Sequence, residues 1–526
     1  MIIKVALLIV FFAVMIAVGF MCRKNSTDVH GFVLGGRSVG PWLTAFAYGT
    51  SYFSAVIFIG YAGQFGWKYG VASTWIGIGN ALIGSLLAWV ILGRRTRLMT
   101  QKLESRTMPE FFGQRFESNT LKLIASAIVF IFLIPYTASL YNGLSRLFES
   151  AFGIDYAWCV IIMSVLTGIY VTAGGYMATA VNDFIQGIIM LFGIVAVIAA
   201  VLNSNGGFME SFAALSKIEA ETNPDLSGAF VSFLGPKPLE LLGVVILTSL
   251  GTWGLPQMVG KFYAIKNEDA ISKGTIISTF FAIVVAGGCY FLGGFGRLYA
   301  DSITYGANGA PVYDSIVPQM LSDLPDIIVA VVIILVLSAS MSTLSSLVLT
   351  SSSTLTLDMI VPLSKKEMTE KKKMLCIRVL IVFFIVISAA IAILQVKSQV
   401  TFIAQLMGIS WGALAGAFLA PFLYGLYSKK VTKASVAACY ITGVGIMIAN
   451  MICTAAGVPF INAFFSSPIN AGVLSMITGL IVVPVVSLFT KKMDKKTVDG
   501  MFECYDRTIT VRASTALGDA QEVEKK

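Results

Sequence analysis

Hydrophobic residues along this chain gather in long runs that are separated by short polar loops. A run of about 20 apolar residues can cross a bilayer as a helix, because lipid offers its backbone groups no hydrogen-bond partners outside the segment. The pattern therefore predicts thirteen membrane-spanning helices. Their approximate positions are 3–22, 42–64, 73–93, 120–146, 157–174, 180–203, 238–260, 274–299, 326–352, 375–395, 402–427, 434–456 and 470–490.

The composition favours the same class of protein. Of the 526 residues, 56% are hydrophobic and only 12% are charged, whereas a soluble domain has about 25% charged residues. The mean hydropathy is +0.83. No small-residue cleavage site follows the first run, so we expect a helix there rather than a signal peptide. We predict an all-α polytopic membrane protein that lies in the plasma membrane.

The basic residues indicate how the helices are oriented. With the N-terminus outside, the cytoplasmic segments would hold 29 Lys and Arg and the external segments seven, with Lys122 at the inner start of a helix. The positive-inside rule therefore predicts an external N-terminus and a cytoplasmic C-terminus. This count places residues 261–273 among the cytoplasmic loops. The net charge of +9 then reflects contact with the inner leaflet rather than with nucleic acid.

Cysteine and histidine usage indicates neither a metal centre nor an enzyme. The seven Cys residues are scattered without a CxxC pair, and His30 is the only histidine. Scattered Cys residues inside predicted helices behave as small hydrophobic residues. No nucleophile–base pair or phosphate-binding loop is present, so we expect neither an enzyme nor an organic cofactor.

Two of the runs contain residues that interrupt helices. The second run holds Gly49 and Thr50 beside further hydroxyl residues, and the seventh holds Gly251, Gly254 and Pro256 in mid-span. The two runs are five helices apart. Paired interrupted helices in corresponding halves are typical of inverted-repeat transporters, whose binding site lies at the breaks. The alternative is that these residues merely allow close helix packing.

The ninth run contains a dense group of hydroxyls. Twelve of the 21 residues from 338 to 358 are Ser or Thr. Ala339, Ser342, Thr343 and Ser346 share one helical stripe, and Ser345 flanks it. Na⁺ is a small hard cation that prefers oxygen ligands, and hydroxyls can supply them without a buried charge. The alternative is that these hydroxyls bond to carbonyls of their own helix.

One carboxylate accompanies the hydroxyls. Asp183 lies at or just inside the start of the sixth predicted helix. A carboxylate at membrane depth is costly and is usually functional, so a cation beside the hydroxyl stripe is a candidate partner. The alternative is an N-cap, in which the carboxylate accepts hydrogen bonds from free N–H groups of the helix start.

Five segments together resemble the sodium/solute symporter family. They are FVLGGRSVGP at 32–41, MPEFFGQRF at 108–116, RLFESAFGI at 146–154, YVTAGGYMATAVNDFIQG at 170–187 and SMSTLSS at 340–346. Tyr176 departs from the family pattern, in which Phe, Leu or Met is usual. The resemblance implies the leucine-transporter fold, with ten core helices in two inverted five-helix repeats. One helix would precede this core and two would follow it, which matches thirteen spans.

The resemblance also implies how the chain is divided. Residues 1–40 would form the first helix and a cytoplasmic loop, and 41–203 would form core helices 1–5. Residues 204–427 would form an external loop and core helices 6–10. Two further membrane helices would lie in 428–490 and a cytoplasmic tail in 491–526. We expect a monomer in the lipid bilayer.

Two sodium sites follow from the resemblance. The family's shared site corresponds to carbonyl oxygens of Thr50, Phe53 and Ala339 with the hydroxyls of Ser342 and Thr343. A second site, present in some members, corresponds to Asp183, Ser342, Ser345 and Ser346. Na⁺ would therefore be the coupling ion, with either one or two ions in each cycle.

The solute site would lie between core helices 1, 3, 6 and 10. The candidates are Ser51, Tyr52, Ser54, Val56, Tyr136, Thr248, Thr252, Trp253, Pro256 and Gln405. Several of these differ from the family's proline pocket, and a small carboxylate-bearing or amino-acid-like solute of the pantothenate, monocarboxylate or proline type is expected. The resemblance predicts sodium-coupled symport of this solute into the cell. The alternatives are a proton-coupled or facilitative carrier on the same fold, and a solute sensor that does not transport.

Overall fold

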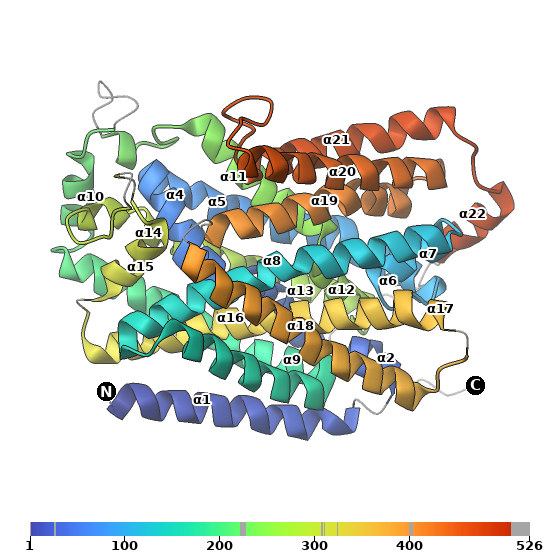
Figure 1. Ribbon diagram of the computed structural model, residues 1–526, viewed down its shortest axis with the longest axis horizontal. Coiled ribbons are helices and arrows are strands. Elements are labelled where there is room, and N and C mark those ends of the chain that lie inside the picture. The colour runs from blue at the N-terminus through green and yellow to red at the C-terminus, as the bar shows by residue number, and fades with distance from the viewer. Residues whose placement is uncertain are drawn as a thin grey trace, which may run out of the picture.

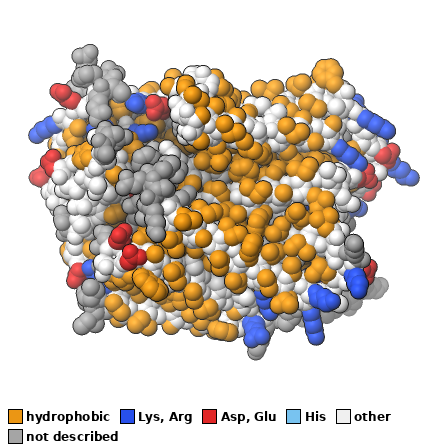
Figure 2. Space-filling view, viewed as in Figure 1, with side chains coloured by type: hydrophobic (Ala, Val, Ile, Leu, Met, Phe, Trp, Pro, Cys, Tyr) orange, Lys and Arg blue, Asp and Glu red, His pale blue; other side chains and the backbone are white. Residues whose placement is uncertain are grey.

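A computed structural model describes residues 2–25, 28–220, 228–306, 309, 311–322, 324–364, 366–398 and 403–506. The described chain is a bundle of long helices whose axes run roughly side by side (Figure 1). Apolar side chains cover the middle of the visible face, and the charged side chains lie towards its two ends (Figure 2). This distribution is expected of a bundle whose middle contacts lipid.

The predicted runs all coincide with helices. The single long helices are α1 (Ile2–Met21), α8 (Asn119–Phe152), α9 (Tyr156–Ser204), α16 (Asp326–Thr354), α18 (Glu370–Ser398), α19 (Ile403–Tyr427), α20 (Lys433–Ala455) and α21 (Pro468–Phe489). The other runs combine short α, 3₁₀ and π segments: α3 (Pro41–Tyr52) with η3 (Val56–Tyr61) and α4 (Ala62–Tyr69), α5 (Thr74–Gly79) with η5 (Asn80–Leu87), η6 (Trp89–Gly93) and α6 (Arg94–Lys102), α11 (Pro238–Leu250) with η8 (Gly251–Gly254) and α12 (Pro256–Tyr263), and α13 (Glu268–Ala282) with η9 (Ile283–Gly287) and α14 (Gly288–Gly293).

Fewer separate helices than thirteen can be counted, because two of them continue through a sharp turn at a glycine instead of ending there. Within the described residues, ten helices are long and apolar enough to span a membrane, or eleven with the bent pair of α11–η8 and α12. Two of the ten, Val56–Lys102 and Tyr156–Ser204, are 47 and 49 residues long. They turn at Gly70 (φ 62°) and Gly175 (φ 56°). Tyr156–Ser204 therefore holds the predicted runs 157–174 and 180–203, and Val56–Lys102 holds the run 73–93 together with the end of the run 42–64.

Gly175 is required at its turn for two reasons. Its positive φ is strained for residues with a side chain, and a Cβ there would lie 2.7 Å from the Phe32 carbonyl oxygen. Gly175→Ala is therefore expected to destabilise the protein by more than about 1 kcal/mol, which thermal unfolding in detergent micelles would measure. Gly168→Ala on the same helix is the control, because its Cβ would meet only Ile385 Cδ1 at an ordinary 3.5 Å. Equal melting temperatures for the two variants would contradict this account.

Two of the membrane helices are broken in mid-span, as predicted. The helix of α3 stops at Tyr52, and Phe53 has an extended backbone (φ −104°, ψ 109°) before η3 continues the span. In the second half, Leu255 is extended between η8 and α12, and the two parts meet at 47°. The last carbonyls before a break have no partner within their own helix, so they are available to other groups.

The broken helices pack around the hydroxyl-rich helix. Segments α3, α12 and α16 contact one another, and α16 also packs along α9 and α8. The helix α19 lies against α8 and against the 3₁₀ segment η8. Among the peripheral helices, α1 packs on α9 at one edge of the bundle, and α20 and α21 lie at the opposite edge (Figure 1). The breaks are therefore buried in the centre.

The segment FVLGGRSVGP folds into a compact connection that precedes α3. Its Arg37 has φ 54° and donates hydrogen bonds to the carbonyl oxygens of Thr100, Ser105 and Tyr263. Partial burial lowers the pKa of this guanidinium below its ordinary value. Arg37 thus links the end of α6 to the end of α12 and holds the segment before α3 against both helices.

Candidate functional site

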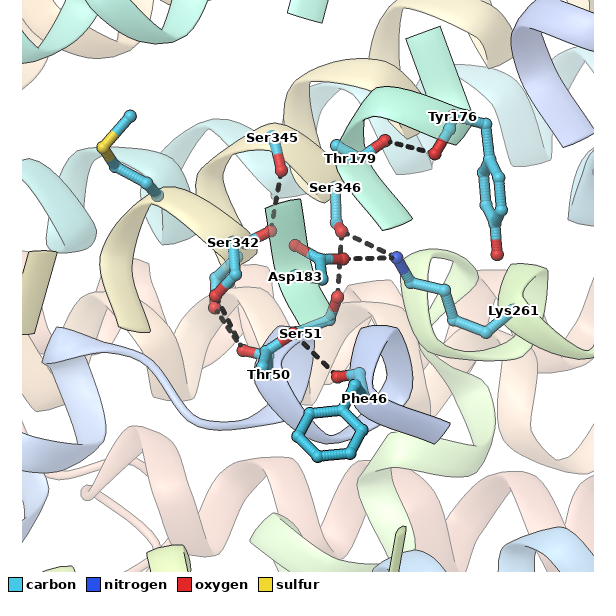
Figure 3. A network of polar contacts seen from close by, with 12 residues as sticks. Phe46, Thr50, Ser51, Tyr176, Thr179, Asp183, Lys261, Ser342, Ser345 and Ser346 are labelled. Carbon is cyan, nitrogen blue, oxygen red and sulfur yellow. Dashed lines mark hydrogen bonds and ion pairs between the residues drawn. The ribbon is translucent and has the colours of Figure 1, made fainter. Parts of the chain in front are cut away.

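The hydroxyls of Ser342 and Thr343 join α16 to the break in α3. Each hydroxyl oxygen lies 3.2 Å from the carbonyl oxygen of Thr50 and 3.1 Å from that of Ala339. The side chains of all four residues are buried. Two hydroxyls and two carbonyls therefore surround a single point between the helices, where a small hard cation could find four oxygen ligands (Figure 3 shows Thr50 and Ser342).

Phe53, the fifth residue predicted for the main sodium site, is the residue at which α3 ends. Its N–H donates to the Gly49 carbonyl at 3.2 Å. Its extended backbone turns its own carbonyl out of the helical path. The break therefore explains chemically why a carbonyl from this position is available for a ligand.

Two further hydroxyls of α16 bond to carbonyls of their own helix. Ser340 donates to the Val336 carbonyl at 2.8 Å, and Ser345 donates to the Ser342 carbonyl at 2.9 Å. Others, including Thr350, Ser353 and Thr354, line a narrow pocket that also contains Arg106. Bonding to a carbonyl of the same helix therefore accounts for Ser340 and Ser345, whereas Ser342 and Thr343 also reach the Thr50 carbonyl of α3.

A second polar cluster surrounds Asp183 and contains a lysine. The Nζ of Lys261 lies 3.5 Å from Asp183 Oδ2 and donates to Ser346 Oγ at 2.9 Å. Ser346 Oγ is 2.8 Å from Ser51 Oγ. Figure 3 shows Lys261 reaching from α12 towards the carboxylate on α9 and the hydroxyls on α16 and α3. Asp183 is fully buried and Lys261 is 3% exposed.

This cluster corrects two sequence-based interpretations. Asp183 is eight residues beyond the Gly175 turn, inside the second part of α9, so the N-cap alternative is wrong. Lys261 was counted as a cytoplasmic loop residue, but it is a buried residue of α12. The bend at Leu255 turns the short helix α12 into the bundle, which explains why a lysine close after an apolar run is not at the surface.

Aromatic residues line the other side of the break in α3. Tyr136 of α8 packs edge-to-face on Trp411 of α19 at 5.9 Å, and Tyr52 lies 6.1 Å from the same indole. The Tyr52 hydroxyl donates to the Thr248 carbonyl. Tyr136 Oη, Ser54 Oγ and Trp411 Nε1 are buried near one another, and none of them makes a hydrogen bond of good geometry among the described residues. Three adjacent spans thus contribute polar atoms that a ligand could satisfy.

The remaining solute candidates differ in their hydrogen-bond partners and in their positions. Thr248 bonds to the Val244 carbonyl, Thr252 to that of Ser249, and the Trp253 indole to that of Ile83. Pro256 starts α12 and Val56 is buried in η3. Gln405 is partly exposed near the start of α19. It precedes Trp411 by six residues, about 9 Å along a helix.

Lys261, Trp411 and Gln257 did not enter the sequence-based site. Lys261 follows Gly260, where the predicted run ended, and Trp411 is one apolar residue within a long apolar run. Gln257, one turn before Lys261, has both amide atoms buried and without a partner among the described residues. A polar residue within two turns of a predicted break was the available signal for Gln257 and Lys261.

Known proteins provide an independent comparison. The family model described as the sodium:solute symporter family matches residues 32–443. The sodium/proline symporter of Staphylococcus aureus (strain JH9) is 30% identical over 497 residues, which cover 93% of this chain and 92% of that protein. A solved structure, the substrate-bound outward-open state of a Na⁺-coupled sialic acid symporter, aligns with a TM-score of 0.73 at 18% identity. It covers 94% of this chain and 99% of that chain.

Proposed function

The chain belongs to the sodium:solute symporter family, and we propose that its solute bears a carboxylate and enters the cell by alternating access. It has the leucine-transporter fold and carries out sodium-coupled symport of a small solute. For the sodium coupling of this transport, the observation that supports a site is the meeting of the Thr50 and Ala339 carbonyls with the Ser342 and Thr343 hydroxyls. A Na⁺ bound there would join α3 to α16 and so favour one arrangement of the two helices. By linkage, ion and solute would then strengthen each other's binding.

The solute site that we propose lies between the breaks, at Tyr136, Ser54 and Trp411. Their unpaired hydroxyl and indole groups are donors, which suit an anionic oxygen. The start of α12 at Pro256 adds the positive end of a helix dipole, which favours a carboxylate. The similarity to a sodium/proline symporter supports an amino-acid-like solute. The other aromatic and hydroxyl candidates would shape the pocket.

Transport in liposomes tests the proposed function. The purified chain would be reconstituted with an inward Na⁺ gradient and given labelled proline, pantothenate, short monocarboxylates and a sugar. We expect accumulation of a carboxylate-bearing solute that stops when choline replaces Na⁺. Accumulation of the sugar alone would overturn the solute class. Accumulation driven equally by a proton gradient without Na⁺ would instead favour a proton-coupled carrier.

Tyr136→Phe tests the position of the solute. Removing the hydroxyl leaves the ring on Trp411 but deletes one donor, so the KM for the solute should rise about five- to tenfold. The apparent affinity for Na⁺ in solute-free binding should not change. Initial rates of uptake and Na⁺-dependent thermal stabilisation would measure the two effects. Tyr141→Phe, on the same helix but one turn and a half farther along, is the control. Equal KM values for the two variants would remove Tyr136 from the site.

We also propose that the N-terminus of α1 faces outside and the C-terminal end faces the cytoplasm of the cell, in the plasma membrane, and that the carrier is a monomer. The support is the density of Lys and Arg near α22 (Lys495–Phe502) and α6. Protease protection of a tag fused after residue 526, in intact cells and in inverted vesicles, tests the orientation. Cleavage of this tag in intact cells would reverse it.

A further inference from the structure

A lysine ammonium lies among the oxygen atoms that were expected to hold a second Na⁺. Two of the four predicted ligands, Asp183 and Ser346, are its neighbours, at 3.5 and 2.9 Å from Nζ. A third, Ser345, donates instead to the Ser342 carbonyl. The fourth, Ser342, bonds to the Thr50 and Ala339 carbonyls of the main site.

The ammonium also satisfies the electrostatic requirement of this position. Asp183 is buried, and an isolated buried carboxylate is strongly destabilising unless a cation accompanies it. Lys261 supplies one positive charge, the same as Na⁺, and three N–H donors. Its surroundings are Asp183 from α9, Ser346 from α16, and the ring of Tyr176, whose centroid is 5.4 Å from Nζ. The carboxylate is therefore already compensated within the chain.

An ammonium and a sodium ion cannot share this position. Oxygen ligands contact hard cations of this size at about 2.3–2.6 Å, so a Na⁺ on Asp183 and Ser346 would fall within contact distance of Nζ. The two like charges would repel each other strongly in a buried site. Either Lys261 leaves or the second Na⁺ does not bind.

A narrow cavity lies beside Lys261 and Ser346. The cavity has a volume of about 50 Å³, and its lining includes Arg106, Lys261 and Ser346. Gln257, also part of its lining, has a buried amide without a hydrogen-bond partner in the described part of the chain. A substitution that removes the charge of the lysine but keeps its bulk, such as Lys261→Met, would free Ser346, which lines this cavity, and its neighbour Asp183 for Na⁺.

We propose that Lys261 is a tethered cation that takes the place of the second Na⁺, so that this carrier binds a single Na⁺ in each cycle. The inference rests on the proposed sodium site at Ser342 and Thr343. It assigns Asp183 a different role from that of a sodium ligand, namely partner of Lys261. It also predicts that the coupling ratio is set by one side chain of α12.

Sodium binding without solute tests the inference. The full chain in lipid nanodiscs would be titrated with ²²Na⁺, with choline to keep ionic strength constant. We expect one Na⁺ per wild-type molecule, two for Lys261→Met, and one for Lys261→Met combined with Asp183→Asn. Lys261→Arg keeps the positive charge and should stay at one. In uptake, the Hill coefficient for Na⁺ should rise from about 1 towards 2 in Lys261→Met.

The outcomes separate this inference from the proposed function. Two Na⁺ in the wild type would overturn the inference and leave the symporter proposal intact, and this result needs no variant to fold. A single Na⁺ in a folded Lys261→Met, judged by size-exclusion profile, would also overturn the inference. No Na⁺ bound to the wild type at all would overturn the proposed sodium site itself.

Discussion

Replacing both Ser342 and Thr343 by Ala is expected to weaken Na⁺ binding at least a hundredfold and to abolish Na⁺-driven uptake. Each hydroxyl is one of four oxygens that surround the proposed ion position. A bond from a neutral group to a charged one contributes about 1.5–3 kcal/mol, so the loss of two should exceed about 3 kcal/mol, which is more than a hundredfold. Each single variant, Ser342→Ala or Thr343→Ala, should bind Na⁺ about tenfold more weakly or worse.

The measurement is the Na⁺ concentration that gives half-maximal stabilisation against heat, together with half-maximal Na⁺ for uptake. Thr343→Ser restores a hydroxyl and should recover most of the affinity. Ser340→Ala is the matched control, since Ser340 is a buried hydroxyl of the same helix that donates to the Val336 carbonyl and, among the described residues, does not contact the Thr50 carbonyl. If Ser340→Ala and Thr343→Ala lowered the affinity equally, the hydroxyls would act through helix packing and the site would be wrong.

The membrane helices and their breaks could be predicted because they depend on local properties. Apolar runs of bilayer length leave the backbone no alternative to the helix. Gly254 and Pro256 interrupt α11–α12 for reasons that lie within those residues themselves, since proline lacks the N–H that continues a helix. The hydroxyl stripe of α16 followed from helical periodicity, and its meeting with Thr50 from the resemblance to a family.

What could not be predicted depends on three-dimensional placement. The positive-inside rule treats a lysine beside an apolar run as a loop residue, and for Lys261 this was wrong. Its burial results from the bend at Leu255 and from Asp183, which is 78 residues away in the chain and lies beside it only in the folded protein. Trp411 resembles every other apolar residue of α19, and only its contacts with Tyr52 and Tyr136 distinguish it.

The buried pair also connects stability to ion binding. Asp183 and Lys261 come from different parts of the bundle, α9 and α12, and α12 is the half-helix that follows the second break. Any movement of α12 relative to α9 must separate the pair or carry it along. Since separating buried charges is costly, the pair should bias the carrier towards conformations in which α12 stays near α9.

Breaking this pair is expected to be among the most destabilising changes in the protein. Asp183→Asn leaves the ammonium buried without its counter-charge, and Lys261→Met leaves the carboxylate in the same condition. Removing one partner of a buried pair costs about 3–5 kcal/mol. The double variant Asp183→Asn with Lys261→Met removes both charges, so its loss should be much smaller than the sum of the single losses. Unfolding in detergent micelles with choline as the only monovalent cation measures the cycle.

Sodium distinguishes a tethered cation from an ordinary structural ion pair. If Na⁺ can take the place of the ammonium, then adding Na⁺ should stabilise Lys261→Met more than it stabilises the wild type. The stabilisation of Asp183→Asn by Na⁺ should be no larger than that of the wild type. Lys429→Met is the control, because its ion pair with Asp499 is exposed and should contribute little. Equal responses of Lys261→Met and Lys429→Met to Na⁺ would show that the carboxylate does not accept the ion. The pair would then be structural only. If Na⁺ could bind to the buried carboxylate of Lys261→Met, adding Na⁺ would have to stabilise the folded variant.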